Sequence, residues 1–188
     1  MKQFIPLLSL LLWACHKQPA PAQLSVYYWK TRFSLSAPQQ QFLSEYDIQK
    51  LYIRYCDIIL LEGEAVPDAP VELDAAALKG KEVIPVIYLK NEVFLSDKVA
   101  AEQLAEKLSG YIEQINRTYN LTVKQVQLDC DWSLKSKTRY FDFIKYFKAK
   151  TPYLLSATIR LHQVKYHDRT GIPPVDYGVL MYYNMGKI

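Results

Sequence analysis

The sequence is poor in the residues that build several common kinds of functional site. It has 6 glycines, 3 histidines and 3 cysteines among 188 residues. The phosphate-loop pattern GxxxxGK[ST] and the dinucleotide pattern GxGxxG are both absent, and so are CxxC and HExxH. These absences argue against a phosphate-binding loop, a zinc finger and a metalloprotease helix. We therefore expect no metal and no other cofactor.

Charge of one sign is also scarce. The chain carries 23 basic and 19 acidic residues, which leaves a net charge of +4 with no basic block. Since nucleic-acid proteins usually cluster their positive charge, we expect no nucleic-acid partner. Hydrophobic residues make up 50% of the chain and aromatic residues 13%, which is typical of a folded protein rather than a disordered one. The length suits about one domain.

The only long apolar run lies at the start of the chain. Phe4 to Trp13 follows a single positive charge and is too short to span a bilayer, which needs about 20 residues. The run has the length of a signal-peptide core and ends in the letters LWAC, which resemble a bacterial lipobox. Trp13 departs from that pattern, because a small residue is usual there.

We therefore expect residues 1–15 to be a lipoprotein signal peptide and Cys15 to be the lipidation site. The acylated Cys15 would hold the protein to membrane lipid on the extracytoplasmic side of a bacterial cell envelope. A plain secretory signal or a buried first helix is the alternative. Residues 16–23 (HKQPAPAQ) are predicted to form a tether, and residues 24–188 to form the domain.

Beyond the tether, short β-rich runs alternate with helical patterns. Six runs of strand length are rich in Val, Ile and Tyr. They are Leu24–Trp29, Lys50–Cys56, Val83–Leu89, Lys124–Cys130, Leu154–Ile159 and Gly178–Tyr183.

Helical signals fill the intervals between these runs. Ser36 and Gln39 form a candidate capping box, and Pro70–Leu78 reads as a helix that ends at Gly80. Ser96 is expected to cap a long helix. Two apolar stripes follow helical spacing: Val99, Leu104, Leu108, Ile112 and Ile115, and then Tyr140, Phe143, Ile144 and Phe147.

Repeated βα units predict an α/β fold with a parallel sheet. Several strands carry one polar face, which favours a barrel interior over the apolar strands of a doubly wound sheet. One such face holds Gln127, Asp129 and Asp131, and another holds Ser156, Thr158, Arg160 and His162. We expect a TIM-barrel-like (β/α) domain with six of eight βα units, C-terminally truncated because a full barrel takes about 250 residues. A complete six-stranded open sheet is the alternative.

The stretch from Gln127 to Trp132 carries the strongest functional signal. Asp129 and Asp131 are two residues apart on a strand, so their carboxylates point the same way, about 7 Å apart. Two buried like charges are costly without a purpose, and such pairs can divide acid and base roles. We therefore treat both as candidate catalytic residues. A metal held with His162 is a weaker alternative, since the spacing is not diagnostic.

In this stretch the chain resembles family 18 glycoside hydrolases, which are (β/α)₈ barrels with the motif DxxDxDxE on the fourth strand. Asp129 and Asp131 fall on the second and third Asp of that motif, while Val126 falls on the first and Ser133 on the catalytic Glu. Serine cannot protonate a glycosidic oxygen, so the usual general acid is missing. The sixth strand resembles the Met-x-Tyr-Asp/Asn segment of the same enzymes, with Met181, Tyr183 and Asn184 on the matching positions.

Over residues 25–188 the chain more closely resembles a family of uncharacterised bacterial lipoproteins with a hydrolase-like barrel. The phrases that carry this resemblance include LYIRYCD, QLDCDW and LSATIRLHQ. It implies a fold and a location in the cell envelope, but no activity.

Other polar and aromatic residues near strand ends are candidates for substrate binding, because rings stack on sugars while polar groups bind hydroxyls. They are Trp29, Arg54, Trp132, Arg160, His162, Tyr183 and Asn184. Each has a structural alternative: Arg54 can pair with Asp57 or Asp129, and His162 and Trp132 can simply pack. Cys56 and Cys130 are expected to be buried thiols rather than a disulfide.

These observations lead to one functional expectation with an alternative. The chain is expected to be a membrane-anchored lipoprotein with a glycoside-hydrolase-like barrel that acts on or binds glycans. The alternative is a non-catalytic glycan-binding or structural envelope protein, because Ser133 stands at the acid position. The oligomeric state is left open.

Overall fold

Six parallel strands form the frame of the protein in a computed structural model, which describes residues 22–182. Hydrogen bonds join the strands in the order β1-β3-β6-β7-β8-β9. Their bounds are β1 Ser25–Tyr28, β3 Lys50–Leu61, β6 Glu82–Leu89, β7 Gln125–Cys130, β8 Leu154–Arg160 and β9 Tyr177–Met181. Each overlaps one of the six strands predicted from the sequence.

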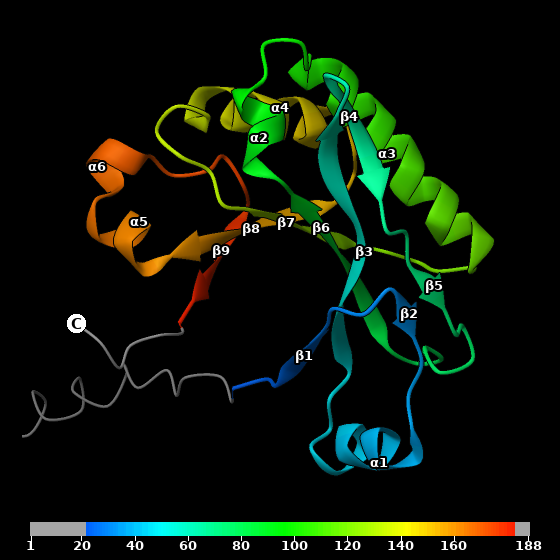
Figure 1. The fold of residues 1–188 in the computed structure, drawn as a ribbon. Coiled ribbons are helices and arrows are strands. Elements are labelled where there is room, and N and C mark those ends of the chain that lie inside the picture. Colours follow the sequence, from blue (N-terminus) through cyan, green and yellow to red (C-terminus); the bar gives the residue numbers. More distant parts are fainter. Residues whose placement is uncertain (1–21, 183–188) are drawn as a thin grey trace, which may run out of the picture.

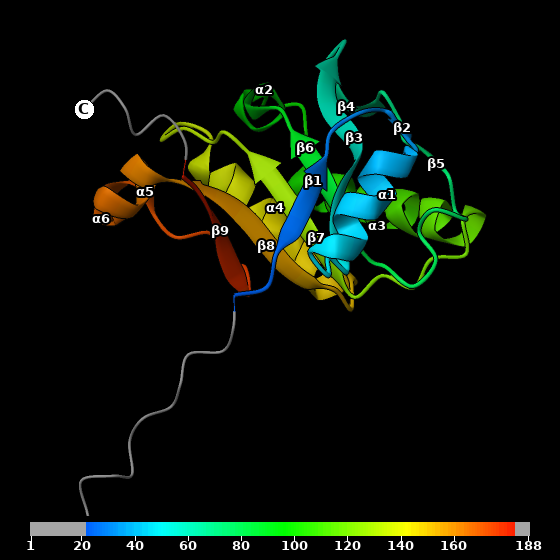
Figure 2. The same cartoon turned by 90° about the horizontal axis from the view of Figure 1, so that it is seen from below.

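The strand order decides between the two predicted architectures. It follows the chain, so every new strand joins the same edge of the sheet, whereas a doubly wound sheet reverses direction at a switch point. The sheet also curls (Figures 1 and 2), and side chains from β1 and β9, its two ends, line one cavity. The six strands therefore form a half-barrel, which confirms the predicted α/β class and the partial TIM-barrel-like architecture.

Three short strands lie outside this parallel frame. Strand β4 (Glu64–Asp68) runs antiparallel to the second half of β3, and the two are joined by a turn at Glu62 and Gly63, which both have positive φ. Strands β2 (Arg32–Phe33) and β5 (Glu72–Leu73) pair with each other. The β3–β4 hairpin projects from the carboxyl end of the sheet (Figure 1) and was not predicted.

The two longest helices pack on the convex face of the half-barrel, and the shorter helices lie around it (Figure 1). The helices are α1 Ala37–Glu45, α2 Asn91–Leu95, α3 Ala101–Thr118, α4 Lys137–Lys150, α5 Leu161–Lys165 and α6 His167–Thr170. The apolar stripes predicted for α3 and α4 are confirmed. All four residues of the α4 stripe are fully buried. In the α3 stripe only Val99, which lies before the helix, is half-buried. Apolar residues on the outer face of the strands, such as Ile53, Ile87 and Leu128, complete this core.

Of the two predicted helix caps, one is confirmed and one is wrong. At α1 the side chain of Gln39 accepts a hydrogen bond from the backbone N–H of Ser36 at 2.9 Å, as the capping box predicted. Ser96, in contrast, ends α2 and does not cap α3, which starts five residues later behind Ala100.

The helix predicted at Pro70–Leu78 is wrong. Glu72 and Leu73 pair with β2, and the carboxylate of Asp74 then accepts hydrogen bonds from the backbone N–H groups of Ala76 and Ala77. A side chain that binds the backbone in this way competes with helix formation. The segment therefore folds into successive turns that end at Gly80.

Candidate functional site

The concave face of the half-barrel carries a ladder of polar residues on β7 and β8. Gln127 lies beside Ser156 in the parallel register, and Asp129 and Thr158 follow two residues later on the same face. The hydroxyl of Thr158 donates a hydrogen bond of 2.6 Å to Oδ1 of Asp129. The period of two in the strands thus groups polar side chains inside the half-barrel, as the sequence predicted.

Asp129 is the buried carboxylate of this group. Only 6% of its surface is exposed. Burial raises its pKa above the usual value, and the negative charges of Asp131 and Asp57 raise it further. The hydrogen bond from Thr158 and the charge of Arg160 act in the opposite direction, but burial is the largest effect.

Asp131 has a different environment from its neighbour. It lies just past β7, and its side chain is 52% exposed. The guanidinium of Arg160, at the end of β8, lies 3.1 Å from its carboxylate and also donates to the carbonyl of Trp132. The two aspartates are therefore held separately: one is buried and bonded to a hydroxyl, the other paired with a cation at the rim.

A β-bulge brings a second ion pair to the same face. The register between β3 and β6 shifts between Arg54 and Cys56, so Tyr55 is the extra residue. Arg54 and Asp57, three residues apart, would face opposite sides of a regular strand, but the bulge turns both inward. Nε of Arg54 lies 2.7 Å from Asp57, and both side chains are mostly buried.

Tyr88 links the two halves of this polar surface. It lies opposite Asp57 on one neighbouring strand and opposite Asp129 on the other, so the three form a row across β3, β6 and β7. Burial raises the pKa of the Tyr88 hydroxyl, and the carboxylates of Asp131, Asp129 and Asp57 raise it further. Its hydroxyl is therefore a hydrogen-bond donor at neutral pH.

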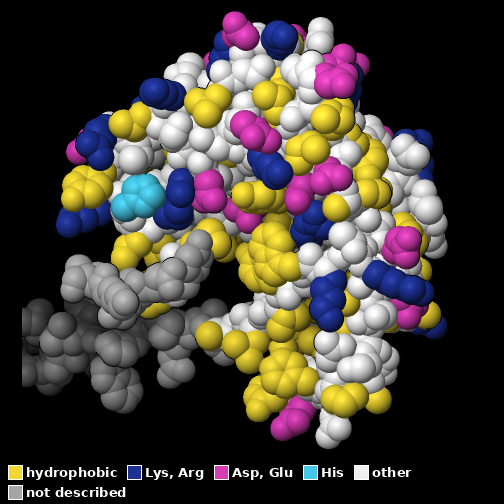
Figure 3. All heavy atoms as spheres, in the orientation of Figure 1, with side chains coloured by type: hydrophobic (Ala, Val, Ile, Leu, Met, Phe, Trp, Pro, Cys, Tyr) yellow, Lys and Arg dark blue, Asp and Glu magenta, His cyan; other side chains and the backbone are white. Residues whose placement is uncertain are grey.

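Aromatic rings on β1 and directly after it close one side of the face. The rings of Tyr27 and Trp29 stack nearly parallel, with centroids 6.0 Å apart, and Tyr27 also stacks on Tyr52. The Tyr27 hydroxyl donates to Oε1 of Gln127 at 2.7 Å, while Trp29 is 46% exposed. In Figure 3, hydrophobic side chains gather over β1, and acidic and basic side chains lie next to them toward the carboxyl ends of the strands.

These groups surround one cavity of about 190 Å³. It combines two aromatic rings, three polar side chains and an apolar wall from β9. Its lining consists of Tyr27, Trp29, Gln127, Asp129, Thr158, Val179, Leu180 and Met181. Of the predicted site residues, Trp29 and Asp129 line this cavity. Arg54, Asp131 and Arg160 belong to the ion pairs on the same concave side.

Two predicted binding residues lie elsewhere. The ring of Trp132 is 4% exposed and stacks on Tyr140 of α4, so it packs in the core and is not free to stack on a ligand. Its packing matches the structural alternative given for this residue. His162 is exposed on α5, because β8 ends at Arg160 and the predicted face does not continue past it. Tyr183, Asn184 and Cys15 lie outside the described residues.

Ser133, at the position of the missing acid, has a structural role. Its hydroxyl lies 3.2 Å from that of Ser136, whose fully buried hydroxyl also donates to Asn91 at the start of α2. The backbone N–H of Ser133 donates to the same hydroxyl. The residue therefore fixes the loop between β7 and α4.

The structure also identifies site residues that were not predicted as such. Tyr27, Gln127 and Thr158 line the cavity, and Tyr88 joins the carboxylates. Strand alternation had placed Gln127 on the same face as Asp129, and Thr158 on the same face as Ser156. The sequence offered no signal that Tyr27 would reach across to β7.

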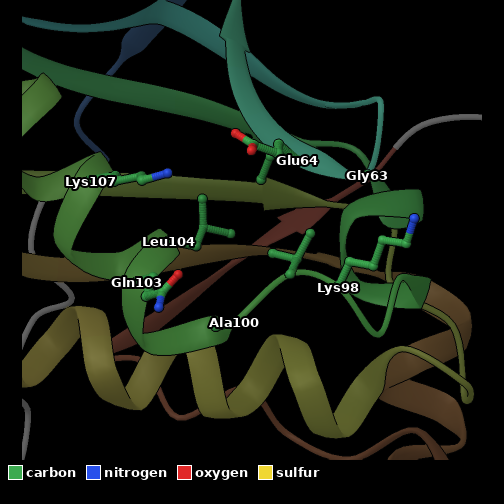
Figure 4. Close-up of a pocket in the computed structure, with 9 residues that line it drawn as sticks. Gly63, Glu64, Lys98, Ala100, Gln103, Leu104 and Lys107 are labelled. Carbon is green, nitrogen blue, oxygen red and sulfur yellow. The ribbon is translucent and has the colours of Figure 1, made fainter.

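A second hollow, of about 140 Å³, lies between the β3–β4 hairpin and the start of α3 (Figure 4). Gly63 and Glu64 line it from the hairpin, Lys98 from the loop before α3, and Gln103 and Lys107 from α3. Within residues 22–182, none of the buried polar atoms that lack a hydrogen-bond partner belongs to this hollow. It therefore carries no sign of a specific ligand.

Neither described cysteine lines the cavity. Cys56 and Cys130 are both buried free thiols, as predicted, and burial raises the pKa of Cys56 to about 12. In the part of the chain that the structure describes, no group of three or more His, Cys, Asp or Glu side chains is placed to hold a metal ion. The same residues include no helix that is long and apolar enough to cross a bilayer.

Comparison with known proteins adds no assignment. No family model, no curated protein and no solved structure matches the chain.

Proposed function

We propose that the concave face of the half-barrel binds a glycan in the cavity between Trp29 and Asp129. The observation that carries this proposal is the pairing of an aromatic platform with a buried carboxylate. Trp29 and Tyr27 stack almost parallel beside a cavity that Asp129 also lines. Rings can pack on the apolar face of a sugar while carboxylate and amide groups bind its hydroxyls.

Two features favour binding over hydrolysis. The position of the general acid is Ser133, whose hydroxyl is engaged with Ser136. Asp131 is paired with Arg160, which holds its carboxylate in place at the rim. Hydrolysis needs an acid that protonates the leaving oxygen, and neither residue fits that role.

Hydrolysis is the second candidate, and one observation favours it. The pKa of Asp129 is raised by burial, which brings this carboxyl group closer to the protonated form that an acid catalyst needs. Asp129 would then act as the acid and Asp131 would stabilise the reacting sugar.

The test uses the full chain in a glycan array, followed by titration calorimetry and a product assay on any glycan bound. A binder gives affinity without product, and Asp129→Asn weakens it while the fold survives. An enzyme gives product that Asp129→Asn abolishes. A structural protein binds nothing, and its stability falls when either aspartate is changed; that result would contradict both candidates.

We also propose that the protein is a lipoprotein held at the outer side of a bacterial membrane through Cys15. The support is the LWAC segment after an apolar run of signal-peptide length. Detergent phase partitioning of cells that express the whole gene tests it. The wild type should enter the detergent phase, and Cys15→Ser should remain in the aqueous phase. Equal partitioning of both would contradict the anchor.

A further inference from the structure

A buried amide in the cavity lacks one of its hydrogen bonds. Gln127 is fully buried on β7 and lines the cavity, yet its Nε2 has no hydrogen-bond partner. Most buried side-chain polar atoms in folded proteins do have a partner, because an unpaired one retains its full desolvation cost. This N–H donor is therefore available to an acceptor atom that does not belong to the described residues.

The carbonyl end of this amide faces Tyr27. The tyrosine hydroxyl donates to Oε1 of Gln127 at 2.7 Å, so the carbonyl end is satisfied. The Nε2 end then carries the free N–H groups. The same tyrosine ring forms part of the aromatic platform, which couples the position of the donor to the surface on which a sugar would stack.

Gln125, two residues earlier on β7, provides a natural comparison. It also faces the inside of the half-barrel, but both ends of its amide are paired. Tyr177 donates to its Oε1, and its Nε2 donates to Glu82. The unpaired donor is therefore a specific property of Gln127 rather than of inner-face glutamines on this strand.

The next strand repeats the pattern at the adjacent position. Ser156 lies beside Gln127 in the register of β7 and β8, is also fully buried, and its hydroxyl has no partner. A single water molecule occupies about 30 Å³ in the liquid, whereas the cavity that Gln127 lines has about 190 Å³. The space thus admits a group larger than one water.

We infer that Gln127 is the specificity-determining residue of the glycan cavity: its Nε2 donates a hydrogen bond to one acceptor oxygen of the bound sugar. The inference rests on the proposed glycan binding. A site built to bond a particular oxygen rejects the analogue that lacks it, because the buried donor is then left unpaired. The protein should discriminate against one deoxy analogue of its sugar more than against the others.

Calorimetric titration of the best glycan and its set of monodeoxy analogues tests this, with wild type, Gln127→Leu and Gln125→Leu. Gln127→Leu should weaken binding of the parent glycan about tenfold. It should also bind the parent and the critical deoxy analogue equally. Gln125→Leu is the matched control and should bind the parent within about twofold of wild type, since a position that makes no ligand contact contributes little to affinity.

A second variant covers the case in which Gln127→Leu fails to fold. Gln127→Glu keeps an acceptor for Tyr27 and the same shape but replaces the donor, so it should lose the same discrimination. If wild type binds a glycan and Gln127→Leu or Gln127→Glu binds it with unchanged affinity and selectivity, the role of Gln127 is overturned while glycan binding stands. If wild type binds no glycan, both proposals fall.

Discussion

The guanidinium of Arg160 lies 3.1 Å from the carboxylate of Asp131 and also donates to the carbonyl of Trp132. One side chain from β8 thus holds two consecutive residues at the end of β7. It fixes the direction in which the chain leaves the strand and the orientation of a carboxylate at the rim of the cavity. The loop that follows is secured from its other end by Ser133 and Ser136.

Arg160→Lys should loosen this strand end. Lysine keeps the charge but cannot present the planar fork that reaches both acceptors. We expect a loss of about 1 kcal/mol of stability and faster amide hydrogen exchange from Asp131 to Lys135. Hydrogen-exchange mass spectrometry measures the second effect. Unchanged exchange in this segment would show that the ion pair does not hold the loop.

The inward-facing pair of Arg54 and Asp57 should be sensitive to loss of one partner. Asp57→Ala leaves a mostly buried guanidinium without its charge partner, so we expect a loss of about 3 kcal/mol in urea unfolding. The double variant Arg54→Met with Asp57→Leu should recover most of it. Asp142→Ala, which breaks the exposed pair with Lys145, is the control and should cost under about 0.5 kcal/mol.

Asp129→Asn should change how stability depends on pH. The folded pKa of Asp129 lies above the unfolded value, so its stabilising contribution is complete below about pH 4 and is lost as pH rises through the folded pKa. The asparagine variant stays neutral and should be more stable than wild type at pH 7. The difference should vanish near pH 3. A variant less stable than wild type at pH 7 would contradict the raised pKa.

Asp176 should behave in the opposite way. Its carboxylate accepts a hydrogen bond of 2.7 Å from the backbone N–H of Leu155 and pairs with Lys148, and both contacts lower its pKa. The stability that they add is present above the unfolded pKa and is lost as pH falls through the folded pKa. Asp176→Asn should cost about 1 kcal/mol at pH 7, allowing for solvent screening. That cost should shrink toward pH 2 in urea unfolding.

The frame of the fold could be predicted because six β-rich runs and two helical stripes have clear periods. Strand alternation also placed Gln127 on the same face as Asp129, and Thr158 on the same face as Ser156. The β3–β4 hairpin was missed because its turn, Glu62-Gly63, is not one of the strong turn dipeptides. The pairing of Arg54 with Asp57 depends on a bulge, which a period of two cannot reveal.

The errors at His162 and Trp132 have different causes. His162 was assigned to the inner face although β8 had already ended at Arg160. Trp132 was chosen for its place beside the aspartates, and it packs in the core instead. Contacts between distant strands were equally hidden. Tyr27 reaches Gln127 across 100 residues of sequence, and nothing near either residue signals that contact.

Binding of the full chain to a glycan array, with wild type beside Trp29→Ala, tests the central claim most directly. Trp29 is 46% exposed and is not one of the buried core residues, so its removal should leave the fold intact. We predict that wild type retains one class of glycan and that Trp29→Ala loses it. A wild type that retains no glycan, or a variant that binds as well as wild type, would contradict the proposed cavity.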